Sequence, residues 1–567
     1  MNKHHIRLGI FLTIIVFIIH VFILDDYGLT WDFHHHFFAG LTRLGRPITD
    51  DLTKFIPFTN PSPLITNDLP FGPLMSIVPV LSYQLFFEKL KLLAFDNAYN
   101  LAIVASGVSG IGILYFFMLE ATNFPTALAS LIFLTLLPRY FGDLHNNMKD
   151  VPQSAAFAFA IWMFWRLVKY QRVKDLLLAS IAFAIAFNTK VNTLVMPIIA
   201  GLWILILHIL NLRNSNDRVL RVTRAGGPPR RGPLVGFLGG KPAAGPVRIL
   251  LYFLFSPMFA LLLWIPFWKD PFGTLLYIPK FFQINTINIE VLLNGTWYCS
   301  GINVPWYYPF WYLAITTPLP ILIFFLIGLI SLIRPINLIK KPLASLLLLW
   351  FFLPLTRYFW PKMGVIDGIR HFEEVVYPLS AIAAIGAINI YTFIKPILPK
   401  IFIRLIGLIG LISLMGNIVL YHPFQISYFN ELVGGIKGAY GKYDIDYWGG
   451  PQKIAIGWIN NRAPVGSTVT VAMAADAAAK YLRPDLLTHL NTTSYDKSDY
   501  VVILNRQSFF YRYYAATNFM LTHTPIHTIQ NQGVPIVWIY DNRSNKPLDI
   551  PQRPWWTGED PCIKAQI

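Results

Sequence analysis

The stretch AYNLAIVASGVSGIGILYFFML, residues 98–119, contains no charged side chain. A helix of about 20 apolar residues is long enough to cross the hydrocarbon core of a bilayer. Apolar runs of this kind recur along the 567-residue chain, which is 55% hydrophobic, only 13% charged and has a mean hydropathy of +0.50. The sequence therefore predicts a polytopic α-helical membrane protein.

Basic residues between the apolar runs set the predicted topology, because loops rich in Lys and Arg stay cytoplasmic. If every run spans, Lys3 lies inside but the strongly basic loop 213–248 lies outside. The conflict disappears if the run 71–87, which is interrupted by prolines, lies in the interface instead of spanning. The remaining candidate spans lie at 6–24, 98–119, 125–138, 152–168, 175–188, 193–212, 249–267, 313–333, 342–355, 375–394 and 402–420.

This topology of about eleven helices has a cytoplasmic N-terminus, and residues 1–24 are predicted to be a retained signal anchor. A transmembrane domain, 1–424, is expected to carry external loops at 25–97, 139–151, 268–312 and 356–372. Residues 425–567 form the predicted external domain. Alternating patterns after residue 450 predict helices over 453–460 and 474–481 and strands over 468–472, 501–504 and 534–540, which together indicate a small α/β domain.

The net charge of +17 fits loops beside membrane spans better than a nucleic-acid partner. The loop 213–248, rich in Gly, Pro and Arg, is expected to be irregular and to anchor at the membrane surface, with regulatory docking as the alternative. Cys299 and Cys562 are both predicted outside, where a disulfide is chemically permitted. The sequence leaves open whether they pair or remain two unrelated thiols.

Acidic and basic side chains gather on the predicted external face. Each group has a simpler explanation: a hydrated loop for the first acids, a helix N-terminus for Asp150, and a snorkelling side chain for Arg370. Consecutive histidines point about 100° apart on a helix, so residues 34–36 predict no metal site, although a divalent cation is an open alternative. The charged residues in question are Asp25, Asp26, Asp32, Asp143, Lys149, Asp150, Lys190, Arg370 and His371.

Several ordered motifs are similar to those of one family. They are GLTWD at 28–32, RYFGDLHNNMKDVP at 139–152, DGIRHF at 367–372, YHPFQISYFNELVGG at 421–435, DYWG at 446–449 and VVILNRQ at 501–507. The chain resembles the bacterial membrane glycosyltransferases related to protein O-mannosyltransferases and to the lipid A aminoarabinose transferase. These are GT-C enzymes (glycosyltransferase family 39-like) that use polyprenyl-phosphate sugars as donors, so the resemblance implies a periplasmic active site in the inner membrane.

The resemblance assigns roles by position. It implies that Asp32 is the catalytic base, and that Asp150, with Asp143 as its rival, is a second catalytic acid. Arg370 and Lys149 would bind the phosphate of the donor. The further candidates are His371 and Lys190. One position departs from the pattern, because many relatives have Asp-Glu where Phe33 follows Asp32.

The implied reaction moves a sugar, a hexosyl or pentosyl group, to an acceptor hydroxyl or amine on a protein, lipid or glycan, without a cofactor. A secondary transporter of a small polar solute is the main alternative, but it would place ionisable residues at mid-span. An oligosaccharyltransferase and a non-catalytic scaffold are two further alternatives for the function. The sequence does not identify the sugar, the prenyl carrier, the acceptor or the oligomeric state.

Overall fold

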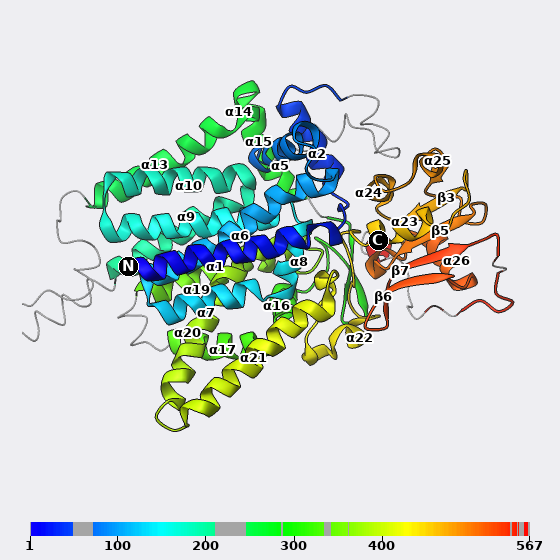
Figure 1. Cartoon of the computed structure of the whole chain (residues 1–567). Coiled ribbons are helices and arrows are strands. Elements are labelled where there is room, and N and C mark those ends of the chain that lie inside the picture. The colour runs from blue at the N-terminus through cyan, green and yellow to red at the C-terminus, as the bar shows by residue number, and fades with distance from the viewer. Residues whose placement is uncertain are drawn as a thin grey trace, which may run out of the picture.

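A computed structural model describes residues 2–48, 72–209, 245–284, 287–333, 342–360, 362–544, 547–552, 554 and 561–564. A bundle of long helices makes up one part of the molecule and an α/β domain makes up the other (Figure 1). The N-terminus lies at the end of the bundle opposite the α/β domain (Figure 1). The predicted fold class, a polytopic helical protein with a small C-terminal α/β domain, is confirmed.

The eleven apolar runs predicted to span are largely helical where the structure describes them, but three are interrupted: 125–138 at 136–137, 249–267 at 264, and 313–333 at 317–318. Seven described helices are long and apolar enough to cross a membrane, and eight if the bent pair α7 and α8 forms one span. The bundle helices are α1 (Lys3–Phe22), α6 (Phe95–Ala121), α7 (Phe124–Thr135), α8 (Pro138–Asn146), α9 (Asp150–Tyr170), α10 (Val173–Thr189), Val191–Ile209, α13 (Gly245–Leu263), α17 (Leu319–Ile333), α19 (Pro342–Thr356), α20 (Val376–Ile394) and α21 (Lys400–Tyr421). The chain is a multi-pass membrane protein, and the count of eleven spans stays a prediction.

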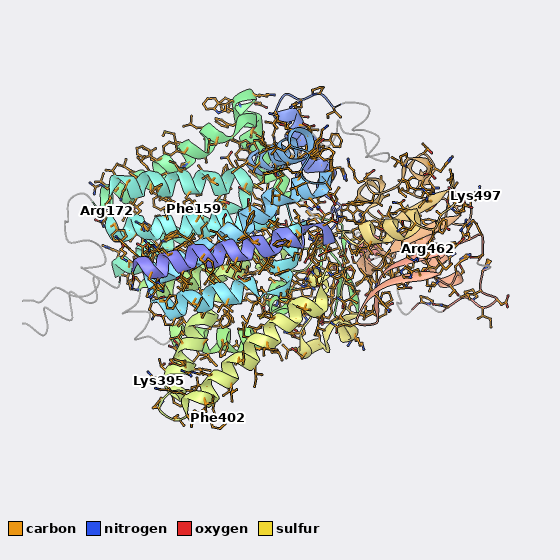
Figure 2. The ribbon with its side chains drawn as sticks, viewed as in Figure 1. Phe159, Arg172, Lys395, Phe402, Arg462 and Lys497 are labelled. Carbon is orange, nitrogen blue, oxygen red and sulfur yellow. A yellow bond between two sulfur atoms is a disulfide. The ribbon has the colours of Figure 1, made fainter. Side chains whose placement is uncertain are left out.

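The centre and the rim of the bundle differ in exposure. Helices α6 and α9 are mostly buried, whereas α1 and α21 expose large apolar side chains such as Phe11 and Ile409. In water such surfaces would be costly, so these helices are expected to face lipid. Arg172 and Lys395, two of the residues expected to be cytoplasmic, lie at the end of the bundle away from the α/β domain (Figure 2).

The segment predicted to lie in the interface folds as α5 (Leu74–Tyr83) and the π-helix η2 (Gln84–Lys89). Neither is among the helices long enough to span. Helix α5 packs against α2 (Phe33–Arg43) at the end of the bundle nearest the α/β domain (Figure 1). A Cβ at Gly40 would lie only 2.0 Å from the Ser76 carbonyl, so glycine is required where these helices meet.

The α/β domain contains a five-stranded sheet of order β4-β3-β5-β7-β6. Strands β3, β4 and β5 run parallel, and β7 is antiparallel to both β5 and β6. The predicted elements are confirmed, whereas β4, β6, α25, η8 and α26 were not expected. The elements are α23 (Gln452–Asn460), β3 (Val469–Ala472), α24 (Ala475–Ala479), α25 (Pro484–Leu487), β4 (Leu490–Asn491), β5 (Tyr500–Leu504), η8 (Gln507–Phe509), α26 (Tyr514–Thr522), β6 (His527–Asn531) and β7 (Val534–Asp541).

Shorter elements complete the described part of the chain. They are η1 (Leu24–Asp26), η3 (Val191–Leu194), α14 (Ile265–Lys269), α15 (Pro271–Ile284), α16 (Tyr308–Thr316), η4 (Arg357–Phe359), η5 (Arg370–Val375), η6 (Gln425–Ser427), η7 (Glu431–Val433), α22 (Gly435–Ala439) and α27 (Pro561–Lys564). Most of the loop 213–248 lies outside the described residues, so its predicted irregular structure is not described.

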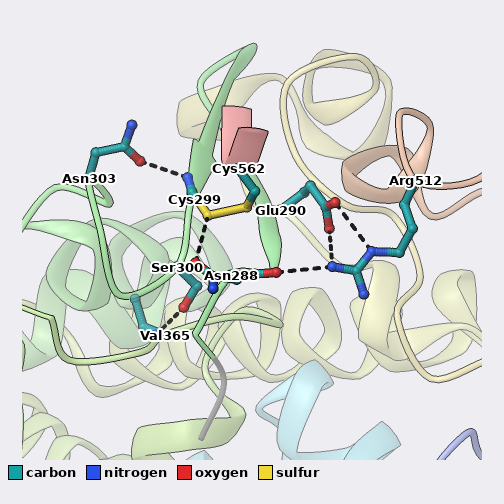
Figure 3. Close-up of a disulfide and its surroundings, with 8 residues drawn as sticks. All are labelled: Asn288, Glu290, Cys299, Ser300, Asn303, Val365, Arg512 and Cys562. Atoms are coloured by element: carbon teal, nitrogen blue, oxygen red, sulfur yellow. Dashed lines mark hydrogen bonds and ion pairs between the residues drawn. A yellow bond between two sulfur atoms is a disulfide. The ribbon is translucent and has the colours of Figure 1, made fainter. Parts of the chain in front are cut away.

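A disulfide joins Cys299 to Cys562, which settles the pairing that the sequence left open (Figure 3). Cys299 ends the hairpin of β1 (Glu290–Leu293) and β2 (Thr296–Cys299). Beside it, Arg512 of the α/β domain lies 2.9 Å from Glu290 (Figure 3). A covalent bond and an ion pair therefore both attach the hairpin to the C-terminal part of the chain.

Candidate functional site

Asp32 occupies the N-cap position of α2, in the loop that follows the first span. The Trp31 amide before it donates to the Trp448 carbonyl at 2.8 Å, so the loop is attached to the DYWG motif. Gly28 lies against the residue that follows this motif, because a Cβ there would be 2.3 Å from the Gly450 carbonyl. The Asp32 carboxylate is 41% exposed and lies 3.4 Å from the guanidinium of Arg370.

Arg370 is held on several sides. Its Nη1 lies 3.2 Å from the Asp367 carboxylate as well as near Asp32, and its guanidinium lies 4.4 Å from the centre of the Trp448 ring. Cations are attracted to the face of an indole ring. With its side chain 14% exposed, Arg370 is fixed in place but still accessible to a ligand.

The turn before Arg370 depends on a glycine. Asp367 and Gly368 both adopt positive φ angles, +56° and +66°. A Cβ at Gly368 would lie 2.6 Å from the guanidinium of Arg139. This close approach, together with the left-handed backbone, explains the DGIR sequence.

The α/β domain contributes to the same cluster. Arg506, just after β5, donates to the Asp367 carboxylate at 2.7 Å and to the Tyr447 carbonyl at 3.2 Å. Its guanidinium also stacks 3.6 Å from the centre of the Phe509 ring. Asp367 therefore lies between the guanidinium groups of Arg370 and Arg506. This arrangement attaches the α/β domain to the segment that carries Arg370.

Asp143 lies beneath this cluster and is fully buried. The Trp448 indole N–H donates to the Asp143 carboxylate at 3.0 Å. The same indole ring makes the cation–π contact with Arg370. The Trp448 backbone is fixed in turn by Asp446, which accepts its amide at 3.0 Å. Asp143 thus supports Arg370 through Trp448.

Asp150 forms an ion pair with Lys190, and both side chains are nearly buried. Asn147 holds the other carboxylate oxygen at 3.1 Å and accepts the Asp150 amide at 2.8 Å. Asn147 also donates its own amide to the Asp143 carbonyl at 2.9 Å. Asn147 therefore links the Asp150 carboxylate to the backbone of Asp143 at the end of α8.

Lys149 makes its hydrogen bond with α5. Its ammonium donates to the Ser76 hydroxyl of α5 at 3.0 Å, and Arg43 of α2 donates to the same hydroxyl at 2.7 Å. Two cations from separate elements therefore converge on one serine at the end of the bundle near the α/β domain.

The candidate histidines differ in position. His371 is buried, its Nε2 accepts from Arg370 at 3.3 Å, and its carbonyl accepts from Arg357. His34 lines a cavity, described below. Within the described ranges no group of three His, Cys, Asp or Glu side chains is arranged to hold a metal ion.

Phe33, the residue that departs from the relatives, packs in an aromatic cluster on α2. It is 2% exposed, and its ring centroid lies 5.2 Å from that of Phe37 and 4.9 Å from that of Tyr99. The Lys480 ammonium lies 5.8 Å from the centre of the Phe33 ring, so the side chain at this position packs among aromatic rings beside a cation. The departure is therefore accommodated by core packing.

Asp25 and Asp26 contact residues outside this cluster. Lys453 of α23 lies 2.9 Å from Asp25 and 2.8 Å from Asp96 at the start of α6. Asp26 lies 2.9 Å from the ring of His422. Both acids join the first loop to the segments that follow α21.

The electrostatics favour an ionised Asp32. Burial raises the pKa of its carboxyl, but the charge of Arg370, with smaller contributions from His36, His35 and His34, outweighs burial. The pKa of Asp32 therefore lies below its usual value, and its proton-accepting form predominates near neutral pH.

The candidates predicted from the sequence include Asp32, Arg370, Asp143, Asp150 and Lys149. No role was predicted for Asp367, Trp448 or Arg506, which assemble the cluster. The signal available for them was their place in the motifs at 367–372, 446–449 and 501–507.

The fold and this charged cluster define a multi-pass membrane protein with a polar site between its helix bundle and its α/β domain. Residues 81–219 match the family described as dolichyl-phosphate-mannose-protein mannosyltransferase. The resemblance to the protein O-mannosyltransferases is thereby confirmed over that part of the chain. No curated protein matches.

Distant likenesses to solved structures cover most of the chain. ArnT from Cupriavidus metallidurans is 14% identical, both bound to undecaprenyl phosphate (TM-score 0.46) and in the apo state (TM-score 0.45). Each covers 95% of this chain and 98% of the other. An oligosaccharyltransferase from Archaeoglobus fulgidus, in complex with Zn and sulfate, is 10% identical with a TM-score of 0.39, over 95% of this chain and 75% of its own.

Proposed function

We propose that this protein is a membrane glycosyltransferase that moves a sugar from a polyprenyl-phosphate donor to an acceptor hydroxyl or amine. The observation that carries the proposal is the pairing of a partly exposed Asp32 with Arg370, 3.4 Å apart, between the bundle and the external domain. A carboxylate can accept a proton from the acceptor, and a guanidinium can neutralise a phosphate. The reaction needs a proton acceptor and a phosphate-binding cation in the same site.

In the proposed reaction the acceptor oxygen or nitrogen attacks the anomeric carbon of the donor sugar. Asp32 takes the proton of the attacking group, a new glycosidic bond forms, and the bond from the anomeric carbon to the phosphate oxygen breaks. The polyprenyl phosphate leaves with the electron pair of that bond. A single displacement of this kind inverts the anomeric centre.

Cations would stabilise the negative charge that develops on the leaving phosphate. Arg370 is assigned to this role because it is accessible and lies beside Asp32. Lys149 is the second candidate, and its neighbour Arg43, which shares Ser76 with it, adds positive charge at the same place.

The second acids have supporting roles in this proposal. Asp150, in its ion pair with Lys190, is positioned at the start of α9, and Asp143 fixes the Trp448 ring that supports Arg370. His371 accepts a hydrogen bond from the Arg370 guanidinium and so helps to fix its position. We keep Asp150 as a catalytic candidate and treat Asp143 as a positioning residue.

The family name supports the donor class, because it names a polyprenyl-phosphate mannose as the donor of that family. The positive-inside pattern supports a cytoplasmic N-terminus and an α/β domain on the opposite side of the membrane. The resemblance to bacterial enzymes supports the inner membrane and a periplasmic α/β domain. The acceptor, whether protein, lipid or glycan, remains the open part of the proposal.

The test is consumption of radiolabelled polyprenyl-phosphate sugars by the full chain in nanodiscs. A panel of hexosyl and pentosyl donors is incubated with and without a crude membrane extract as the source of acceptor. Consumption of one donor that requires the intact protein supports the proposal. Accumulation of a labelled solute inside proteoliposomes, with no donor consumed, favours the transporter instead.

A further inference from the structure

A cavity of about 600 Å³ lies where the first external loop meets the α/β domain. The loop contributes Trp31 and His34 to its wall. The domain contributes Asp476, Thr492, Arg512 and Tyr513 among others. The volume falls within the range of small-molecule pockets, about 300–1,000 Å³.

The cavity occupies the edge of the sheet where ligands bind in α/β domains. Its domain wall consists of residues 473–477 after β3, 492–495 after β4, and 512–515 after β5 and η8. These three strands are parallel, with β4 and β5 on opposite sides of β3. Open α/β sheets bind ligands outside the carboxyl ends of their strands, where strand order reverses.

The wall after β3 also has an unusual backbone. Met473 and Ala474 both have positive φ angles, +66° and +53°. Residues with a Cβ rarely adopt this region, and such strain gathers at ligand-binding sites.

The lining favours a neutral, hydroxyl-rich ligand. Trp31, Tyr513 and Tyr514 supply aromatic faces, while Thr492, Thr493 and Asp476 supply hydrogen-bonding groups. Sugars combine an apolar C–H face with a rim of hydroxyls, which suits aromatic rings bordered by polar groups.

The charges that border the cavity are largely compensated. Arg512 is paired with Glu290 at 2.9 Å. Burial lowers the pKa of His34, although the neighbouring carboxylates of Asp476 and Asp32 act to raise it. The cavity therefore offers no unbalanced cation to attract a phosphate group.

The position relative to the reacting carboxylate completes the inference. Trp31 and His34, which line the cavity, flank Asp32 in the chain. We propose that this cavity binds the carbohydrate part of the acceptor and directs one of its hydroxyls toward Asp32. The inference rests on the proposed function and specifies it, because the acceptor is then a glycan or glycolipid and not an unmodified protein.

The experiment measures sugar binding without a donor. The full chain in nanodiscs is examined by saturation-transfer NMR with methyl glycosides of glucose, galactose, mannose and N-acetylglucosamine, and with a peptide rich in Ser and Thr. Ala515→Trp fills the cavity from an exposed position at the start of α26. Asn518→Trp places the same side chain at an exposed position on that helix outside the cavity lining.

We expect at least one glycoside to give a signal that Asn518→Trp retains and Ala515→Trp removes. Thr492→Ala, which deletes one hydrogen-bonding group, should weaken that binding about fivefold. Unfolding temperatures of the variants establish that they are folded. The inference is overturned if no glycoside gives a signal sensitive to Ala515→Trp, or if only the peptide does.

The two proposals fail independently. Donor consumption requires no glycoside binding, because water can replace the acceptor, and glycoside binding requires no donor. A protein that consumes a donor but binds no glycoside in the cavity retains the proposed function and loses this inference.

Discussion

The guanidinium of Arg370 lies 3.4 Å from the carboxylate of Asp32, although the two residues belong to opposite ends of the transmembrane domain sequence. Asp32 follows the first span and Arg370 precedes α20. The contact exists because both segments pack on Trp448, through the Trp31 amide on one side and the Arg370 guanidinium on the other. Folding of the segment after α21 therefore assembles the proposed site.

Replacing Arg370 by Gln is expected to shift the pH dependence of transfer. The pKa of Asp32 lies below its usual value in part because of Arg370, so its base form persists as the pH falls. Without the guanidinium this pKa rises, and the acid limb of the kcat/KM profile moves to higher pH. The rate at neutral pH should also fall about 10²-fold or more, as when an anion-stabilising donor is removed.

Arg370→Lys is the matched control for that experiment. Lysine keeps the charge but not the planar guanidinium, so the acid limb should stay near its original pH while the rate falls. An unshifted acid limb in Arg370→Gln would show that Arg370 does not set the ionisation of the base.

Trp448→Phe is expected to destabilise the protein by about 1–3 kcal/mol, because the buried Asp143 carboxylate loses its indole donor. Asp143→Asn should cost less, since its amide oxygen still accepts from the indole. Unfolding of both variants in the same detergent measures the difference. Equal stability of Trp448→Phe and the unaltered protein would contradict the supporting role of this contact.

Lys453→Met tests the connection between the α/β domain and the bundle. Lys453 neutralises Asp96, which is nearly buried, so its loss should cost about 1–3 kcal/mol. Asp25→Asn is the control: Asp25 is 76% exposed, and its pair with Lys453 should contribute less than about 1 kcal/mol. Thermal unfolding compares the two variants, and an equal loss in both would be the contrary result.

The disulfide predicts a specific peptide map. Digestion without reductant should give one linked species containing Cys299 and Cys562, which separates into two on reduction. Thiol labelling before reduction should modify neither cysteine. Cys299→Ser should free Cys562 for labelling, whereas labelling of both cysteines in the unaltered protein would contradict the pairing.

Much of the fold could be predicted because its signals are local. Apolar runs such as 98–119 identify helices by composition, and the buried strands β5 and β7 are continuous apolar segments. Strand β6 was missed because its residues alternate between buried and exposed with polar side chains, and β4 because it has only two residues. Neither carries a hydrophobic pattern of its own.

The site was predictable only in its parts. Asp32 and Arg370 stand out as charges beside spans, but nothing in the sequence indicates that Arg506 reaches Asp367 or that Trp448 lies under Arg370. Such contacts depend on how distant segments pack. The same holds for Cys299 and Cys562, whose pairing follows from the hairpin lying beside α27.

The central claim is that Asp32 is the base of a sugar transfer, and Asp32→Asn tests it most directly. Asp26→Asn is the matched control, since Asp26 is an acid of the same loop that contacts His422 instead. The measurement is the rate of transfer from the consumed polyprenyl-phosphate sugar, with equal amounts of folded protein in nanodiscs. We predict that Asp32→Asn lowers the rate by about 10²–10⁴-fold while Asp26→Asn retains most of it; an Asp32→Asn variant as active as the Asp26→Asn control would contradict the assignment.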